Sequence, residues 1–354
     1  MKKIAIFNYD LQIGGIEKSL VNLLNNIDLN TYQIDLYLFN KDIDDSYLKY
    51  LPDNINLIIL KKKFKKLYNF LPFNIVKNIK FDVKSKKYDL AIDFNSYQSV
   101  VASACLQVKA KKRIMMIHNN NLLKKRYEFK YRILHFFMKN KYQYFDTFIG
   151  VSKGVIDPFI KLNKLPNKEY LVIPNIIDTN EIKTKMNYEI NLNINSKKYN
   201  LVTVGRLCYQ KGFDLLLKDF KSIITSSPLY HLYIVGDGEE RKKISKLIKK
   251  YQLSDHVTLL GSTLNPYNIM NLMDGFVLTS RYEGQGMVIL EAKALGLDIF
   301  IPKRLTNFVE DVEGTNDLIN DILNAKKHDH QFNDLKKYNN KIKKAWEELF
   351  DAED

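Results

Sequence analysis

Two glutamates eight positions apart mark the part of the chain best suited to chemistry. Glu283 stands in a glycine-rich turn completed by Gly284, Gln285, Gly286 and Met287, and Glu291 lies further on, in the helix expected to follow. A carboxylate accepts hydrogen bonds from two vicinal hydroxyls at once, and backbone N–H groups at the start of a helix bind phosphate oxygens. The apolar neighbours of Glu291 predict that this glutamate is buried. The segment therefore favours a polyol ligand that carries phosphate.

Two cations precede this segment on either side of one expected strand-to-helix turn. Arg206 follows the strand 201–204, and Lys211 stands just before the next helix. Such a pair could hold a diphosphate and neutralise the charge that develops on it as a leaving group. The alternative is two ordinary surface cations. That alternative is stronger for Lys211 than for Arg206, because the chain has 48 lysines and 7 arginines.

A pair of glycines, Gly14 and Gly15, lies between the first expected strand and the first expected helix. Paired glycines there let backbone N–H groups approach an anion at the helix N-terminus. The same pair could simply form a tight turn, and neither Gly-x-Gly-x-x-Gly nor the Walker pattern is present. The sequence leaves both interpretations open.

The histidines and a short acidic motif offer weaker signals. His118 follows the expected strand 113–117, where a histidine can take part in chemistry or only hydrogen-bond within a loop. His328 and His330 have a metal-like spacing, but they lie in a polar segment and we expect them to be solvated. Asp42 and Asp44 fit the Asp-x-Asp pattern that binds Mn²⁺ in some transferases, yet they stand in a charged turn. We expect a solvated loop there, no metal site and no cofactor.

The elements that must position these residues alternate between short apolar runs and helical patterns, which is typical of α/β domains with parallel sheets. Expected strands of a first series are residues 4–7, 34–39, 55–60, 90–94, 113–117, 147–151 and 170–173. Those of a second series are residues 201–204, 232–235, 257–260, 276–278 and 299–301. The carboxyl edge of each sheet is where ligands bind in such folds.

This pattern predicts two Rossmann-like, doubly wound domains that face a central cleft. We expect the first at residues 1–178, a polar hinge at 179–200 and the second at 201–325. Apolar residues recur at three- and four-residue steps in the last stretch, which predicts an amphipathic helix within 330–354 whose apolar face packs on another element.

Composition limits the class of protein. The chain has 354 residues, 45% hydrophobic and 27% charged, which fits two globular domains and excludes collagen-like or disordered chains. Cys105 and Cys208 show no spacing for a zinc site or a disulfide framework, so a reducing cytoplasm fits. We find no signal-peptide pattern and no apolar run of membrane-spanning length, and we expect neither secretion nor a membrane span.

A formal charge of +15 attracts anions, and two basic stretches stand out. Residues 61–87 contain ten lysines and one acid, interleaved with aromatic residues, and residues 109–132 contain nine cations and only Glu128 as an acid. Such stretches either keep the surface soluble or dock on anionic lipid. We favour contact with the inner face of the plasma membrane over nucleic acid, because no nucleic-acid-binding module is present.

Several short motifs, taken in order, resemble the retaining glycosyltransferases of family 4, which have the GT-B fold. The resemblance covers about residues 1–300. The motifs are Gly14-Gly15, Val151-Ser152-Lys153-Gly154-Val155, Ile173-Pro174-Asn175-Ile176-Ile177-Asp178, Gly205-Arg206-Leu207, Gln210-Lys211-Gly212, Val235-Gly236-Asp237-Gly238, Asn265-Pro266-Tyr267 and the segment from Glu283 to Glu291. The amino-acid sequence of the last segment is most similar to that of bacterial members that build capsular or other cell-surface polysaccharides.

The resemblance implies a role for each matching residue. Arg206 and Lys211 would hold the diphosphate of a nucleotide-sugar donor, most simply a UDP-sugar, while Glu291 takes the ribose hydroxyls and Glu283 meets the donor sugar. Gly284 to Met287 would supply nearby amides, and Gly15 would approach the phosphates from the other domain. His118 matches a histidine near the reacting sugar. The nucleobase pocket would be lined by the loops that carry Gly236, Gly261 and Ser262.

The resemblance also implies a metal-independent, front-face transfer to a lipid-linked saccharide or a polysaccharide. One departure is that the Gly-Gly loop usual after residue 297 is missing. The resemblance still implies that the helix within 330–354 packs back toward the first domain. Two other hypotheses remain open at this stage. One is a non-catalytic protein of the same fold that binds polyanions or membranes, and the other is a nucleotide-sugar epimerase.

Overall fold

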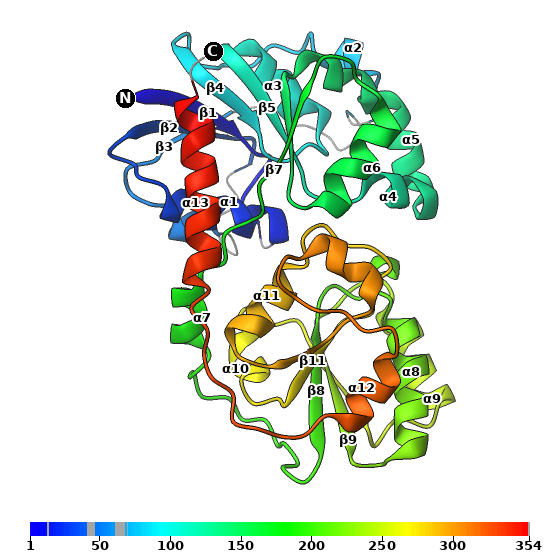
Figure 1. Cartoon of the computed structure of the whole chain (residues 1–354). Coiled ribbons are helices and arrows are strands. Elements are labelled where there is room, and N and C mark those ends of the chain that lie inside the picture. Colours follow the sequence, from blue (N-terminus) through cyan, green and yellow to red (C-terminus); the bar gives the residue numbers. More distant parts are fainter. Residues whose placement is uncertain (13, 41–46, 61–67, 69, 353–354) are drawn as a thin grey trace. The chain divides into compact units, whose positions relative to one another are not determined.

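The computed structural model describes residues 1–12, 14–40, 47–60, 68 and 70–352, in two compact units. The first unit is formed by residues 1–176 together with 337–354, and the second by residues 177–336. Each unit contains one parallel sheet with helices packed against it (Figure 1). Asp42, Asp44 and residues 61–67 of the first basic stretch lie outside the described residues.

The first unit is built on a seven-stranded sheet with the order β3-β2-β1-β4-β5-β6-β7. All its pairings are parallel. The strands are β1 (Lys2–Phe7), β2 (Tyr32–Leu38), β3 (Asn56–Ile59), β4 (Lys87–Asp93), β5 (Lys109–Ile117), β6 (Thr147–Gly150) and β7 (Glu169–Val172). The strand order reverses between β1 and β4, so the carboxyl ends of these two strands form the switch point where such sheets bind ligands.

The helices of the first unit connect these strands and cover the sheet. They are α1 (Gly15–Asn26), η1 (Tyr47–Tyr50), α2 (Phe73–Val76), α3 (Ser99–Gln107), α4 (Asn121–Tyr127), α5 (Phe129–Met138), η3 (Lys139–Tyr144) and α6 (Lys153–Asn163). Helix α1 shows the sequence logic, because Leu20, Leu23 and Leu24 recur at three- and four-residue steps and are buried.

The second unit repeats this plan with five parallel strands in the order β10-β9-β8-β11-β12. The strands are β8 (Tyr199–Val204), β9 (Tyr230–Val235), β10 (Val257–Gly261), β11 (Gly275–Val277) and β12 (Asp298–Phe300). Its helices are α7 (Thr179–Lys185), η4 (Tyr209–Lys211), α8 (Phe213–Ser226), α9 (Arg241–Lys250), α10 (Tyr267–Met270), α11 (Met287–Ala294), η5 (Lys303–Phe308) and α12 (Leu318–Asn324). Here the order reverses between β8 and β11.

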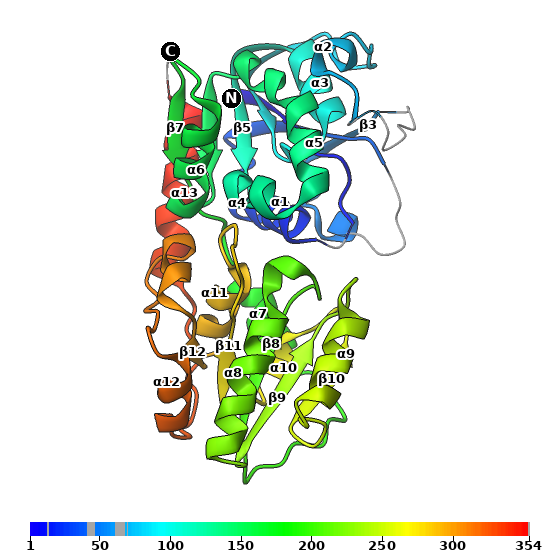
Figure 2. The same cartoon turned by 90° about the vertical axis from the view of Figure 1, so that its right-hand side faces the viewer.

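Helices α8, α9 and α12 lie on one face of the second sheet and α10 and α11 on the other (Figures 1 and 2). Phe213, Leu216, Leu217 and Phe220 of α8 follow helical spacing and join the buried core on the sheet. All twelve expected strands are present, each within a few residues of its expected ends, and the two doubly wound α/β units confirm the expected fold class.

The structure divides the chain at other residues than the sequence suggested. The expected hinge 179–200 belongs to the second unit and contains α7. Side-chain amides of Asn265, Asn268 and Asn271, on and beside α10, donate to backbone carbonyls of residues 185, 188 and 186, which ties the segment down. The polar composition of the segment suggested a hinge, but the contacts that anchor it are themselves polar hydrogen bonds.

The last helix, α13 (Lys336–Asp351), belongs to the first unit from residue 337 onward. Its Phe350 ring meets Tyr32 at the start of β2 with ring centroids 5.1 Å apart, and the Tyr338 hydroxyl donates to the carbonyl of Asn175 at 3.1 Å. Trp346 on the same apolar face is buried. This is the amphipathic helix that the periodicity predicts.

The segment before α13 is also anchored, contrary to the expectation that its histidines are only solvated. His328 Nε2 lies 3.0 Å from Asp298 Oδ1, although the His328 side chain is half exposed. His330 lies between two backbone carbonyls, those of Gly296 at 2.9 Å and Met273 at 3.1 Å. Both residues therefore fasten the segment to the second unit.

Candidate functional site

The predicted donor-binding residues meet at the carboxyl edge of the second sheet. The loop after β8 carries Arg206 and Lys211, and the loop after β11 carries Glu283. These two strands are neighbours across the switch point. The residues therefore lie at the edge that the sequence predicts, which is where ligands bind in open α/β sheets.

An ion pair joins the two loops at this edge. Lys211 Nζ lies 2.8 Å from Glu283 Oε1, and the Ser280 hydroxyl donates to the same oxygen at 2.5 Å. The Glu283 side chain is 6% exposed and that of Lys211 is 18% exposed. Lys211 is therefore not an ordinary surface cation. Arg206, in contrast, is exposed at the same edge.

Glycines allow these loops to approach one another closely. Gly212 has φ of +65°, and a Cβ on it would lie 2.6 Å from the carbonyl oxygen of Thr279. Gly236, after β9, has φ of +139°, and a Cβ there would lie 2.0 Å from the carbonyl oxygen of Gly205. Only glycine fits such backbone at this spacing. The strand-end loops thus pack backbone against backbone beside Lys211.

Glu291 is buried in α11 and has a partner that the sequence argument did not assign. The Tyr267 hydroxyl of α10 donates to Glu291 Oε1 at 3.2 Å. Helix α11 begins after Gly286, whose φ of +67° places the turn 284–287 at the helix N-terminus. A carboxylate can accept several hydrogen bonds at once, so the Tyr267 contact is compatible with a role for Glu291 as an acceptor.

The residues expected at a nucleobase pocket lie on the neighbouring strands of the same edge. Gly236 follows β9, Gly261 ends β10, and the Gly236 N–H donates to the Gly261 carbonyl at 2.7 Å. Ser262 follows and is exposed. The structure therefore brings Arg206, Lys211, Gly236 and Gly261 to one edge of one sheet.

In the first unit, the glycine pair lies at the start of α1, after the switch-point strand β1. A Cβ on Gly15 would meet no atom within 4 Å, whereas one on Gly14 would lie 2.2 Å from Glu17 Oε2. Burial raises the pKa of Glu17 to about 7. Gly15 is exposed and open to approach, so the structure leaves room for the predicted anion.

His118 follows β5 and is buried. Its Nε2 lies 2.7 Å from the backbone carbonyl of Phe94, just after β4. Burial lowers the pKa of His118 to about 4, so the ring is neutral near pH 7. Because a carbonyl only accepts, Nε2 carries the proton and Nδ1 is left as the acceptor.

A buried lysine beside this position escaped the sequence argument. Lys141 is fully buried and its Nζ donates to the carbonyl of Ser96, a residue with φ of +55° in the loop after β4. Asp93 accepts from the Ser96 N–H at 3.0 Å in the same turn. Burial lowers the pKa of Lys141 to about 8 and raises that of Asp93. In sequence, nothing distinguishes Lys141 from the many other lysines of the chain.

The described part of the chain offers neither a metal cluster nor a membrane span. No group of three or more His, Cys, Asp or Glu side chains there could hold a metal ion. No helix in the same part of the chain is long and apolar enough to cross a membrane. Cys105 and Cys208 are both buried free thiols.

The chain belongs to the family 4, or group 1, glycosyltransferases. The family model for glycosyltransferase family 4 matches residues 13–181, and that for glycosyl transferases group 1 matches residues 185–310. Together these matches cover the second sheet and, apart from β1, the first. The sequence left three hypotheses open, and membership of this family supports the transferase. The protein is a glycosyltransferase with the GT-B fold.

Two curated relatives illustrate the similarity. One is an uncharacterised glycosyltransferase of Methanocaldococcus jannaschii, 29% identical over 53% of this chain and 47% of its own length. The other is the Campylobacter jejuni N-acetylgalactosamine-N,N'-diacetylbacillosaminyl-diphospho-undecaprenol 4-alpha-N-acetylgalactosaminyltransferase, 26% identical over 83% of this chain and 79% of its own. The match thus spans about half of the first relative and most of the second.

Solved structures share the fold at low identity. TarM of S. aureus, as a mutant in complex with fondaparinux, alpha-GlcNAc-glycerol and UDP, has a TM-score of 0.69 at 15% identity and covers 99% of this chain and 100% of its own. Anabaena HepE in complex with UDP-glucose has a TM-score of 0.65 at 17% identity, with coverage of 99% and 100%. Both confirm the GT-B fold.

Proposed function

We propose that this protein is a retaining glycosyltransferase that moves a sugar from a UDP-sugar to a lipid-linked saccharide or a polysaccharide of the bacterial cell surface, such as a capsule. The observation that carries the proposal is the Lys211–Glu283 ion pair at the switch point of the second sheet, beside exposed Arg206. It presents a half-buried cation and an exposed one at the edge where a diphosphate would bind.

The reaction requires charge to be neutralised on the leaving diphosphate. The acceptor hydroxyl forms a bond to the anomeric carbon on the face that the diphosphate leaves, and the carbon–phosphate oxygen bond breaks. The hydroxyl proton passes to the departing phosphate oxygen, so no nucleophilic side chain is needed. Lys211 has three N–H donors, and its contact with Glu283 leaves donors for phosphate oxygens. Arg206 supplies the second cation.

The other site residues take roles that fit their positions. Glu291, held by Tyr267, accepts from ribose hydroxyls, and Glu283 also meets the donor sugar. The amides of Gly284, Gln285, Gly286 and Met287 lie at the start of α11, where negative charge is favoured. Gly236, Gly261 and Ser262 line the base, Gly15 approaches phosphate, and neutral His118 contacts the reacting sugar. We expect no metal requirement.

The names of several relatives support the donor and acceptor classes. HepE has been solved with UDP-glucose and TarM with UDP. The Campylobacter jejuni relative is named for a diphospho-undecaprenol acceptor, and a Staphylococcus aureus relative for poly(ribitol-phosphate). These acceptors are lipid-linked saccharides or cell-surface polymers, and we place the acceptor of this chain in the same class.

We also propose that the enzyme works peripherally on the inner face of the plasma membrane, through one face of α5. Phe129, Ile133 and Phe136 follow steps of four and three along this helix, and their exposed fractions are 65%, 37% and 66%. Exposed cations surround them, namely Arg126, Lys130, Arg132 and Lys139. Apolar side chains framed by cations suit the headgroup region of an anionic bilayer.

Vesicle binding tests this surface. Phe129→Ser with Phe136→Ser should weaken binding to vesicles that contain phosphatidylglycerol by at least about tenfold, because each buried Phe contributes roughly 1.5–3 kcal/mol. Tyr188→Ser, which removes an exposed aromatic ring of the second unit, is the control. Equal binding by the double variant and the wild type would show that this face of α5 does not contact the bilayer.

Thermal unfolding against UDP, GDP, ADP and CMP tests the donor site. A nucleotide at 100 times its Kd adds about 2.7 kcal/mol, so UDP should raise the unfolding temperature measurably. Arg206→Ala with Lys211→Ala should abolish this rise. Lys327→Ala, which removes an ion pair with Asp274 at the opposite end of β11, should keep it.

Product analysis then tests the reaction itself. Incubation with UDP-sugars and an undecaprenyl-diphosphate saccharide should give a product whose anomeric configuration, measured by NMR, matches the donor. Chelation by EDTA should leave the rate unchanged. An inverted product or loss of the rate with EDTA would contradict the mechanism proposed here.

A further inference from the structure

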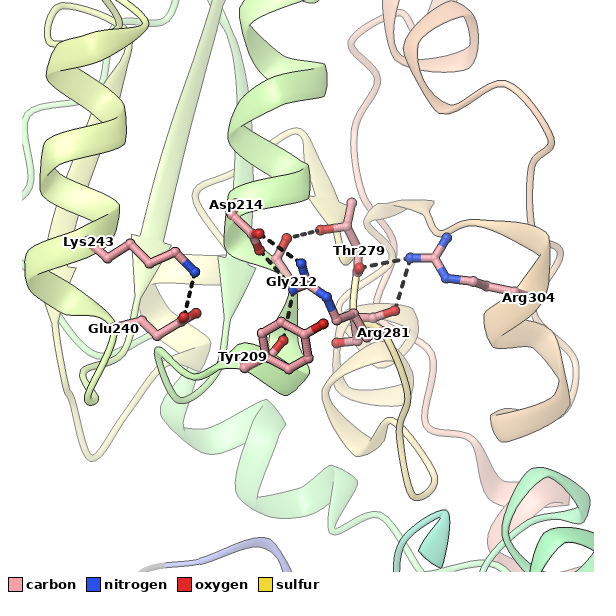
Figure 3. A network of polar contacts seen from close by, with 9 residues as sticks. Tyr209, Gly212, Asp214, Glu240, Lys243, Thr279, Arg281 and Arg304 are labelled. Atoms are coloured by element: carbon pink, nitrogen blue, oxygen red, sulfur yellow. Dashed lines mark hydrogen bonds and ion pairs between the residues drawn. The ribbon is translucent and has the colours of Figure 1, made fainter. Parts of the chain in front are cut away.

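Arg281 lies between the two loops of the donor site and holds both. Its guanidinium forms two parallel hydrogen bonds to Asp214 at the start of α8, each 2.8 Å long (Figure 3). The same group donates to the carbonyl of Tyr209 at 2.9 Å, and its Cζ lies 4.0 Å from the centre of the Tyr209 ring. The Arg281 side chain is 16% exposed. It is thus held on three sides.

The backbone around Arg281 reinforces this link. The Arg281 N–H donates to the carbonyl of Gln210 at 2.8 Å, and the Gln210 side chain donates to the carbonyl of Tyr282 at 3.1 Å. The Thr279 hydroxyl donates to the carbonyl of Gly212 at 3.0 Å. Residues 209, 210, 212 and 214 are therefore all bonded to residues 279–282.

A second arginine supports the same loop from behind. Arg304 of η5 donates from one Nη to the carbonyls of Thr279 and Ser280, at 2.9 and 3.0 Å (Figure 3). Helix η5 follows β12, in the part of the chain that departs from the family pattern. The Thr279 carbonyl, which faces Gly212, and the Ser280 carbonyl are thus fixed by Arg304, a residue that the family motifs do not include.

We infer that Arg281 is a positioning residue that holds Lys211 against Glu283 before the donor binds. This inference rests on the proposed function. The two residues that flank Lys211, Gln210 and Gly212, are hydrogen-bonded to the loop that carries Arg281. Glu283 stands two residues after Arg281 in the same loop. An unrestrained lysine side chain loses rotamer entropy when it is ordered, and this framework removes that cost from donor binding.

Turnover measurements test the inference. Arg281→Ala should lower kcat by about 10- to 100-fold, because displacements near 1 Å have effects of that size. In a Lys211→Ala background the same substitution should lower kcat by less than about threefold, because the effects of two residues that act through one group are not additive. Arg281→Lys should recover only part of the rate, since an ammonium cannot form the paired contacts with Asp214. Lys327→Ala is the ion-pair control.

A second readout needs no turnover. Acetylation of lysines by an amine-reactive reagent, followed by mass spectrometry, should modify Lys211 several-fold faster in Arg281→Ala than in the wild type. Exposed Lys218 on α8 is the internal reference. Lys327→Ala should leave the Lys211 rate unchanged.

The outcomes separate the two proposals. Unchanged labelling of Lys211 in Arg281→Ala, or losses of kcat that multiply with those of Lys211→Ala, would overturn the positioning role. If the wild type transfers no sugar from any nucleotide-sugar, the proposed function fails, and the labelling rate alone then decides whether Arg281 holds Lys211.

Discussion

Gly212→Ala should distort the donor site and destabilise the second unit, and the structure indicates by how much. A left-handed φ costs a residue with a Cβ about 1–2 kcal/mol. At Gly212 the new Cβ would also lie 2.6 Å from the Thr279 carbonyl oxygen, closer than real contacts allow. That oxygen is held by Arg304 at 2.9 Å and cannot move without losing the bond. A lost hydrogen bond adds about 1–3 kcal/mol, for a total of about 2–5 kcal/mol.

Gly261→Ala is the matched control for backbone strain. Its φ is +78°, but the nearest atom to a Cβ there is an Arg241 nitrogen at 3.9 Å. It should cost only the strain, about 1–2 kcal/mol. Because the only tryptophan, Trp346, lies in the first unit, the assay is amide hydrogen exchange in β8 and β11 of the second unit. Equal losses for Gly212→Ala and Gly261→Ala would refute the reasoning from the Thr279 contact.

Two further predictions concern the carboxylate and the histidine. Glu291→Gln should weaken UDP binding about tenfold, as measured by calorimetry. The reason is that a charged acceptor gives a hydrogen bond about 1.4 kcal/mol stronger than a neutral one. Unchanged affinity would show that Glu291 does not meet the ribose. For His118, the folded pKa of about 4 lies below the value near 6.5 of an unfolded chain, so the unfolded chain takes up the proton first. The free energy of unfolding of the first unit should therefore fall as pH drops from about 6.5 to about 4, and His118→Gln should flatten part of this slope, as measured by urea unfolding with Trp346 fluorescence.

The sheets could be predicted from the sequence because the signal is local. Each strand is a short β-branched or aromatic run, and buried parallel strands need nothing else to be recognised. The polar segment 179–200 was not predicted to belong to the second unit. Its helix α7 has seven residues, and the segment is held through asparagine amides rather than through an apolar face. Local patterns do not show such ties.

The site could be predicted only as separate residues. The types of Arg206, Lys211 and Glu291 indicated their chemistry, but the partner of Lys211 stands 72 positions away. The sequence assigned no role to Arg281 or Tyr267, since their roles depend on which loops the topology brings together. Buried Lys141 was hidden for a different reason, because nothing in the sequence distinguishes it from the other lysines of a chain that has 48.

The return of α13 to the first unit affects the order in which the chain can fold. Because residues 177–336 are inserted between two parts of that unit, the ribosome completes the whole second unit before the last piece of the first is made. Until then, the side of Tyr32 that Phe350 covers stays open to water. The second unit can mature early and alone, whereas the first must wait as a nascent sheet with an uncovered apolar surface. That interval is when the chain most needs protection from aggregation.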